Sequence, residues 1–255
     1  MRAGIGTARS ECEMSTDGIM IPQACTRCAV RSRALCSALS PSELTALNNA
    51  SRFRTFTEGQ TIVTEGDPSI IANIASGICI EKKAMADGRE QIVSVLFPAD
   101  FISGELDGVS DTTVQAVSDV KLCYHDRAGF QRLLGEHAGL QRAYLAHARH
   151  ELANAREWML LLGQKTAEER VATFLLRLAT RYTDAGCRHY PLETAVDGMV
   201  FEIPITRAQI ASYTGLTIET VSRKFRTLSD QGAIALDGTR AVRITNVARL
   251  RLLSE

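Results

Sequence analysis

Three cysteines stand close together near the start of the chain, in the pattern Cys25-x2-Cys28-x7-Cys36. Thiolates are soft ligands that bind zinc in sets of three or four, and four of them hold an iron–sulfur cluster. The spacing alone therefore predicts a metal or cluster site and leaves the choice between zinc and iron–sulfur open. The remaining cysteines are Cys12, Cys79, Cys123 and Cys187.

A second set of chemically capable side chains shares one face of a helix predicted to begin after Thr217. Glu219, Ser222, Arg223 and Arg226 follow one another at i, i+3, i+4 and i+7, which places them on one side of a helix. An arginine can donate two hydrogen bonds to O6 and N7 of guanine, and a glutamate can accept one from N4 of cytosine. The same spacing also fits a solvated Glu–Arg pair.

The elements around this face decide between the two interpretations. Thr206-x2-Gln209 is a capping box that predicts a helix ending near Gly215, and the second helix follows after one turn. The segment 233–244, with Asp237-Gly238 at its turn, predicts a β-hairpin. Two short helices and a hairpin describe a winged helix-turn-helix, so the partner is double-stranded DNA. The candidate DNA-binding residues are Thr206, Thr217, Glu219, Ser222, Arg223, Lys224 and Arg226, of which Lys224 is expected to contact phosphate or solvent.

The chain before this module is rich in short β segments. From about residue 53 to 124, β-branched runs alternate with turn signals, which predicts an antiparallel β-roll or jelly roll. A capping box at Ser40, with Pro41 and Glu43, predicts a short helix in front of it. Another capping box at Thr166 predicts a helix to about residue 181.

After Gly139 the apolar period becomes helical. Apolar residues recur at alternating intervals of three and four, which is an a/d seam of nearly three heptads. This helix either packs on its own β-roll or pairs with a twin in a parallel homodimer. We favour the dimer, because two alanines in the seam permit close approach. The seam residues are Leu145, Ala148, Leu152, Ala155, Met159 and Leu162, and Gly163 is expected to end the helix.

Residues 206–223, Thr-Arg-Ala-Gln-Ile-Ala-Ser-Tyr-Thr-Gly-Leu-Thr-Ile-Glu-Thr-Val-Ser-Arg, resemble the DNA-binding signature of the CRP/FNR family of bacterial transcription regulators. The resemblance covers residues 20–250. It implies an α+β fold with an N-terminal β-roll, a long dimerisation helix and a C-terminal winged helix-turn-helix. The expected parts are a cysteine-rich segment (1–39), a β-roll sensor (40–138), the dimerisation helix (139–163) and the DNA-binding domain (164–255).

The E-x-x-S-R form of the second helix resembles the FNR branch. In that branch the positions of Glu219, Ser222 and Arg223 read base edges of a TTGAT-N4-ATCAA palindrome. The resemblance also implies a homodimer and contact with RNA polymerase. Within the branch, C-x2-C-x7-C resembles FnrN/FixK-like members, whereas the best-known spacing is C-x2-C-x5-C.

The resemblance implies an oxygen-labile [4Fe-4S] cluster with Cys25, Cys28, Cys36 and Cys123 as ligands, because Cys123 falls where the FNR branch places its distal ligand. An ordinary strand cysteine is the alternative for Cys123. His125 lies close by, so a zinc site of three cysteines and one histidine also stays open. Among the other cysteines, we expect Cys79 in the core, Cys12 as a spare thiol and Cys187 as incidental or a second oxidation site.

The predicted function is an oxygen- or redox-responsive DNA-binding regulator, not an enzyme. The same fold with a zinc or direct thiol redox sensor is the alternative, and an iron–sulfur electron carrier is the alternative from another class. The turn Gly104-Glu105-Leu106 resembles that of cyclic-nucleotide-binding relatives. No Arg or Lys lies between Arg89 and Lys121, however, so a buried cyclic phosphate would lack a cationic partner.

Composition agrees with a globular regulator. The chain has 255 residues, of which 45% are hydrophobic and 23% charged, with 29 basic and 29 acidic side chains. From Pro204 onward, 8 basic residues face 4 acidic ones, a surplus of four positive charges that suits nucleic acid. No apolar run approaches the ~20 residues of a membrane span, and no secretory signal is visible. We therefore expect the cytoplasm, with reduced thiols and no membrane contact.

Overall fold

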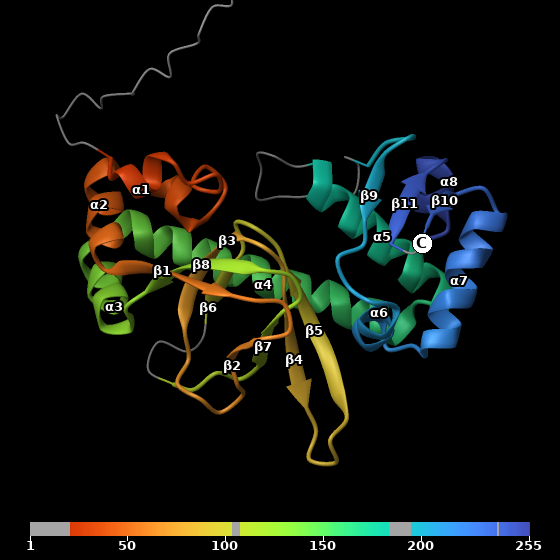
Figure 1. The fold of residues 1–255 in the computed structure, drawn as a ribbon, viewed down its shortest axis with the longest axis horizontal. Helices are drawn as coiled ribbons and strands as arrows, with labels where there is room; N and C mark the ends of the chain where they lie inside the picture. Colours follow the sequence, from red (N-terminus) through yellow and green to blue (C-terminus); the bar gives the residue numbers. More distant parts are fainter. Residues whose placement is uncertain (1–20, 104–107, 184–194, 239) are drawn as a thin grey trace, which may run out of the picture.

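The computed structural model describes residues 21–103, 108–183, 195–238 and 240–255 (Figure 1). A β-roll with short helices at one end comes first, a long helix runs alongside it, and a helical module with a small sheet follows. This order confirms the predicted α+β class, with its β-roll, long helix and winged helix-turn-helix. None of the described helices is long and apolar enough to span a bilayer.

Two four-stranded antiparallel sheets form the roll. Their facing sides enclose a core that includes Ile74, Cys79, Val114 and Leu122, as the alternation of apolar residues predicts. The first sheet has the order β1 (Ser51–Phe56), β8 (Val120–His125), β3 (Ile71–Ser76) and β6 (Phe101–Ser103). The second has the order β2 (Thr61–Val63), β7 (Thr113–Ala116), β4 (Cys79–Ala84) and β5 (Glu90–Leu96).

Strand β8 separates the core from the site. Val120 and Leu122 are buried between the sheets. Cys123 and His125 alternate with them, so they lie on the outer face of the first sheet. In the register of that sheet, Cys123 lies between Phe53 of β1 and Asn73 of β3.

Short helices cover this outer face at one end of the roll (Figure 1). The capping box at Ser40 forms as predicted, because Ser40 N–H donates to Glu43 Oε2 at 2.9 Å and Glu43 N–H donates to Ser40 Oγ at 3.3 Å. The helices pack through Leu35 and Leu47 against Phe130 and Leu140. They are α1 (Gln23–Thr26), the 3-10 turn η1 (Leu35–Ala38), α2 (Pro41–Asn49) and α3 (Arg127–Glu136).

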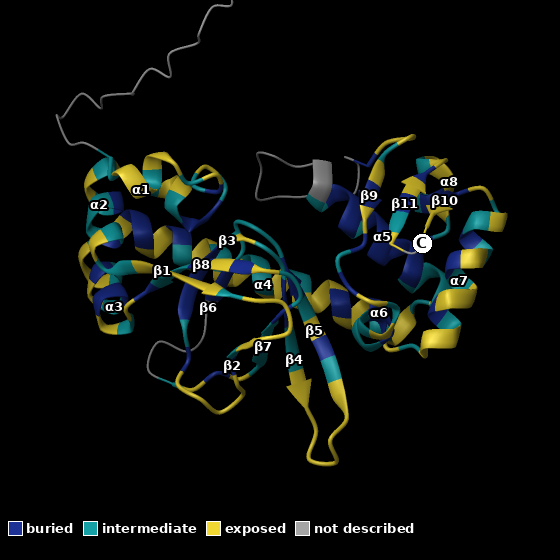
Figure 2. Ribbon diagram, in the orientation of Figure 1, coloured by how far each residue is buried: buried dark blue, intermediate teal, exposed yellow. Residues whose placement is uncertain are grey.

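The long helix α4 runs from Ala138 to Gln164, one residue beyond the predicted limits at each end. One side of it is buried by its own chain through Leu140, Ala143, Trp158 and Leu161. The predicted seam lies on another side. Leu145, Leu152 and Met159 are 56%, 52% and 72% exposed, Ala148 and Ala155 are exposed, and Leu162 is half-buried. Figure 2 shows buried, intermediate and exposed positions along α4. Within the described part of the chain, most of the predicted seam is therefore exposed.

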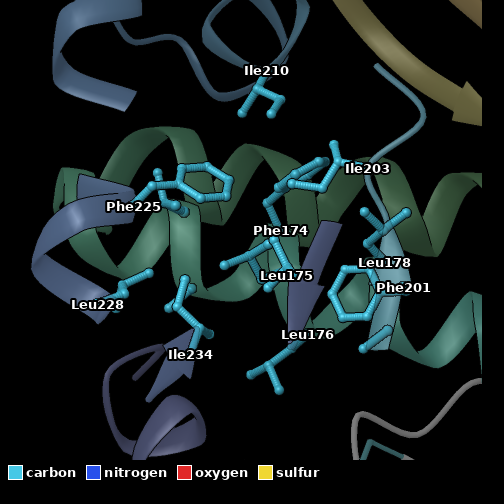
Figure 3. Close-up of a cluster of buried hydrophobic side chains, with 14 of the residues drawn as sticks. Phe174, Leu175, Leu176, Leu178, Phe201, Ile203, Ile210, Phe225, Leu228 and Ile234 are labelled. Carbon is cyan, nitrogen blue, oxygen red and sulfur yellow. The ribbon is translucent and has the colours of Figure 1, made fainter. Parts of the chain in front are cut away.

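The C-terminal module surrounds α5, whose residues Phe174, Leu175, Leu176 and Leu178 point into a core shared with the later elements (Figure 3). Two helices with a turn at Gly215 and a three-stranded sheet, ordered β10-β11-β9, confirm the winged helix-turn-helix. The elements are α5 (Ala167–Thr183), β9 (Val200–Glu202), α6 (Arg207–Thr214), α7 (Ile218–Asp230), β10 (Ile234–Asp237), β11 (Ala241–Ile244) and α8 (Val247–Leu252).

Candidate functional site

The four predicted ligand cysteines come together from separate elements. Cys25 lies in α1, Cys28 follows that helix, Cys36 lies in η1 and Cys123 lies in β8. All four line one cavity between the short helices and the outer face of the first sheet. The cavity is also lined by Ala24, Val30, Arg31, Ala34, Leu44, Leu47, Asn48, Ser51, Phe53, Asn73 and His125.

The thiols influence one another electrostatically. Burial, together with the smaller effect of the nearby Cys123, Cys25 and Cys28, raises the pKa of Cys36 to about 12. Burial and the neighbouring Cys25 and Cys28 also raise the pKa of Cys123 to about 12. Burial and Cys28 raise the pKa of Cys25. Thiolates at Cys25, Cys36 and Cys123 are therefore disfavoured in this cavity unless bound cations compensate their charge, which is what metal coordination provides.

Cysteine thiolates are suitable ligands both for zinc and for an iron–sulfur cluster. A tetrahedral zinc with Zn–S bonds near 2.3 Å requires sulfurs about 3.8 Å apart. Among the described residues, no group of three or more His, Cys, Asp or Glu side chains is close enough to hold a metal ion as it stands. In a four-iron cluster each cysteine binds a different iron, so the four sulfurs stand farther apart. Four cysteines around one mainly apolar cavity satisfy the ligand number and chemistry of such a cluster.

Polar side chains close the cavity on the sheet side. His125 is 1% exposed, and burial lowers its pKa to about 4, which keeps the ring neutral. Its Nε2 lies 2.9 Å from Asn73 Nδ2, and its Nδ1 lies 2.6 Å from Ser51 Oγ. Ser51 and Asn73 are not among the site residues predicted from the sequence. The strand pattern could have indicated them, because both are polar residues on strands beside the one that carries Cys123.

The other three cysteines are not part of this cavity as the structure describes it. Cys79 is fully buried in the core of the roll, as predicted, and burial raises its pKa to about 12. Cys12 and Cys187 lie outside the described residues, as does the turn Gly104-Glu105-Leu106.

The predicted DNA-reading face forms on α7. Val221, Phe225 and Leu228 are buried against the module. The opposite side exposes four of the predicted residues, Glu219, Ser222, Arg223 and Arg226. A helix that is anchored on one side and polar on the other can enter a major groove.

Two of the other predicted residues serve as helix caps. Thr206 Oγ1 accepts from the N–H of Gln209 at 3.2 Å, and Thr217 Oγ1 accepts from the N–H of Thr220 at 3.2 Å. Both threonines are exposed at the starts of α6 and α7, where backbone N–H groups and the helix dipole favour a phosphate.

Lys224 differs from the rest of the predicted set. Its ammonium nitrogen donates to Glu168 Oε2 of α5 at 2.8 Å, and the two side chains are 25% and 20% exposed. The side chain therefore ties α7 to α5 in this structure, contrary to the expected phosphate or solvent contact. A helical spacing gives the angular position of a residue but does not reveal that a neighbouring helix offers a carboxylate there.

The sequence also gave no sign of how α6 is fixed. Arg207 lies with its guanidinium 3.3 Å from the ring centre of Phe225, which holds α6 against α7. The ring of Tyr213 stacks on Trp158 of α4 at 4.0 Å, and the Trp158 indole N–H donates to the Tyr213 carbonyl at 3.2 Å. Ser212 Oγ accepts from the N–H of Ile92 in β5 at 3.0 Å. The DNA-binding module is thus attached both to the long helix and to the roll.

A second cavity lies between the roll, α4 and the C-terminal module. Its lining includes several carboxylates, namely Glu81, Asp100, Asp111, Glu151 and Glu157. The arginines of the described lining are already paired, since Arg181 Nη1 lies 2.8 Å from Asp100 Oδ1 and Arg177 pairs with Glu157. This charge distribution does not favour an anionic cyclic nucleotide.

Two family models match the chain. The model described as a Crp-like helix-turn-helix domain matches residues 169–253, and the one described as a cyclic nucleotide-binding domain matches residues 53–137.

Relatives match over nearly the whole length. The chain is 37% identical over 227 residues to the transcriptional activator protein FnrL of Cereibacter sphaeroides, covering 89% of this chain and 90% of the relative. It is 37% identical over 213 residues to the nitrogen fixation regulation protein FixK of Bradyrhizobium diazoefficiens, covering 83% and 86%. The solved structure of FixK2 from Bradyrhizobium japonicum superposes with a TM-score of 0.71 at 30% identity, covering 80% of this chain and 98% of that one.

Proposed function

This chain belongs to the CRP/FNR family of transcription regulators, in the branch of FixK and FnrL, and from that premise we propose that it responds to oxygen. The family members bind DNA and act as dimers, and the relatives are transcriptional activators rather than enzymes. The finer proposal is a [4Fe-4S] cluster held by Cys25, Cys28, Cys36 and Cys123. The dimer then binds a TTGAT-N4-ATCAA-like palindrome and contacts RNA polymerase.

The single observation that carries the proposal is the convergence of the four cysteines on one cavity. They come from three elements and from positions up to 98 apart in the printed sequence, 25 to 123. A [4Fe-4S] group bound there supplies an oxygen-labile link between the N-terminal segment and the roll. Without it, Cys36 and Cys123 keep their protons, because burial raises the pKa of both thiols.

That protonation counts against a direct thiol sensor. The thiolate is the reactive form of cysteine, and a pKa of about 12 at Cys36 and Cys123 leaves almost none of it at neutral pH. Oxidation of these thiols by mild oxidants is therefore slow unless a metal first deprotonates them.

The packing of η1 suggests how cluster binding at Cys36 could affect dimer formation through α4. Cys36 lies in η1 next to Leu35, which packs in the same core as Leu140 and Ala143 of α4. Fixing Cys36 therefore fixes the contact between η1 and the first turns of the long helix. That helix presents its exposed apolar stripe to a second copy, and pairing places two recognition helices one DNA turn apart.

The test is a set of single serine variants at the four positions, isolated without oxygen. Serine is a harder and more basic ligand than cysteine and holds soft iron poorly. Each variant should therefore lose most iron and sulfide and bind the palindrome weakly. Cys79→Ala is the matched control, because Cys79 is buried in the core away from the cavity. A variant at Cys123 that alone keeps a full cluster would move the fourth ligand elsewhere.

A further inference from the structure

A buried polar network lies directly behind two of the proposed ligands. His125 and Asn73 are 1% and 2% exposed, and with Ser51 they line the cavity that holds the cysteines. Burying polar groups costs free energy unless each finds a partner. The core of the roll does not use these residues, because they lie on the outer face of the sheet, beside Cys123.

The hydrogen bonds determine which group donates and which accepts at each step of the network. Asn73 Nδ2 donates to His125 Nε2 at 2.9 Å, so the ring proton is on Nδ1 and is donated to Ser51 Oγ at 2.6 Å. Ser51 then keeps its own hydroxyl proton to donate. The Leu47 carbonyl accepts this proton at 2.5 Å, and Cys123, which lines the cavity together with Ser51, offers its sulfur as an alternative acceptor.

Asn73 reaches the other sulfur. Its Nδ2 has a second hydrogen, which is directed at Cys36 Sγ at 4.0 Å, within range of a small adjustment when the thiol becomes a thiolate. The network thus begins at His125 and ends at two sulfurs. Among the described residues, the Asn73 carbonyl oxygen has no hydrogen-bond partner, so packing and the two donor contacts hold the amide in place.

We propose that Ser51 and Asn73 donate hydrogen bonds to the ligating sulfurs of Cys123 and Cys36, and that His125 positions both donors. This inference rests on the proposed cluster and adds to it the residues that adjust its stability. Hydrogen bonds to ligating sulfurs raise the reduction potential of a cluster. Groups behind the ligands also fix their orientation, and losing one typically costs about 10–100-fold in metal affinity or activity. His125 is a positioning residue, because it acts on the sulfurs only through Ser51 and Asn73.

The experiment uses the anaerobically isolated full chain. Ser51→Ala should retain iron and sulfide, but its visible absorbance should decay in air roughly tenfold faster, at the low end of the range for such residues. The reduction potential of the bound cluster should fall. Ser51→Thr keeps a hydroxyl and should restore both values. Thr55→Val is the matched control, since Thr55 is exposed on the same strand and lies outside the cavity.

A second variant keeps the test independent of Ser51. His125→Phe retains a ring that can stack on Phe130, whose centre lies 5.6 Å from that of His125, and removes both nitrogens. It should lower the potential in the same direction as Ser51→Ala. If His125→Phe does not fold, the Ser51 series decides the question.

The outcomes separate this inference from the proposed function. Wild-type protein without iron and sulfide overturns both. A wild-type cluster whose potential and decay rate are unchanged in Ser51→Ala overturns only the hydrogen-bonding role. Failure of Ser51→Thr to restore the wild-type values would also overturn it, because the effect would then arise from packing.

Discussion

The ion pair between Lys224 and Glu168 gives a prediction that separates a stabilising residue from a DNA-reading one. Changing Lys224 to Ala removes a 2.8 Å contact between side chains that are about three-quarters withdrawn from water. Exposed ion pairs contribute about 0–1 kcal/mol, and hydrogen bonds to charged groups about 1.5–3 kcal/mol. Glu168 keeps its other hydrogen bond, from Gln231 Nε2 at 2.9 Å, so the expected loss is ~1–2 kcal/mol.

The loss depends on pH in a defined direction. Hydrogen bonds from Lys224 and Gln231 lower the pKa of Glu168. A lowered folded-state pKa stabilises the folded protein above the unfolded-state value, about 4.3, and this stabilisation disappears as the pH falls through the folded-state pKa. The difference between wild type and Lys224→Ala should therefore be full at pH 7 and vanish at strongly acidic pH.

Denaturant unfolding at a series of pH values measures the difference, and at pH 7 the melting temperature should fall by about 2–8 °C. Lys83→Ala is the control, because Lys83 is 47% exposed and its nearest carboxylate lies 3.6 Å away. This variant should lose less than ~1 kcal/mol of unfolding free energy.

At temperatures where both variants are folded, Lys224→Ala should bind DNA almost as tightly as wild type. Arg223→Ala should keep its stability but lose ~1–3 kcal/mol of binding and discriminate less at one G·C pair per half-site. Undiminished stability of Lys224→Ala together with uniformly weaker DNA binding would refute the structural role.

Two further changes test other parts of the structure. Leu152→Glu introduces like charges into the exposed stripe of α4, so sedimentation should show folded monomers that no longer bind the palindrome. The control is Ala153→Glu, which should remain dimeric because Ala153 is exposed on the same turn but lies off the stripe. A Leu152→Glu protein that is still a dimer would place the interface elsewhere. Burial and neighbouring carboxylates raise the pKa of Glu81 to about 7, and a raised carboxyl pKa costs stability as the pH rises above the unfolded value of about 4.3. Glu81→Gln should therefore raise the free energy of unfolding by ~1–2 kcal/mol at pH 8 and leave it nearly unchanged near pH 4, whereas an equal gain at both pH values would contradict a protonated Glu81.

Local signals in the sequence predicted the helix starts and the tight turns. The capping boxes at Ser40, Thr166 and Thr206 all form, because each needs only residues within three positions of the cap. The turn between α6 and α7 has Gly215 in the left-handed region, with φ at 65°, which glycine adopts without strain. Combined with apolar periodicity, these signals were sufficient for the winged helix-turn-helix and the long helix.

Contacts between distant segments could not be predicted in this way. The contact between His125 and Ser51 spans 74 positions, and that between His125 and Asn73 spans 52. Both depend on which strands pair and in which register. Strand β6, with three residues, is too short to show alternation by itself. For the same reason, the cysteine spacing alone left zinc and iron–sulfur undecided, since Cys123 joins the site only through the fold.

The most direct test of the central claim is metal analysis of the wild-type protein purified without oxygen. We expect about four iron and four sulfide per chain, as a [4Fe-4S] cluster requires, with little zinc. Exposure to air should then remove the sulfide and, in parallel, the binding to a TTGAT-N4-ATCAA site. Zinc without sulfide, or DNA binding that survives air unchanged, would contradict an oxygen-labile cluster at Cys25, Cys28, Cys36 and Cys123.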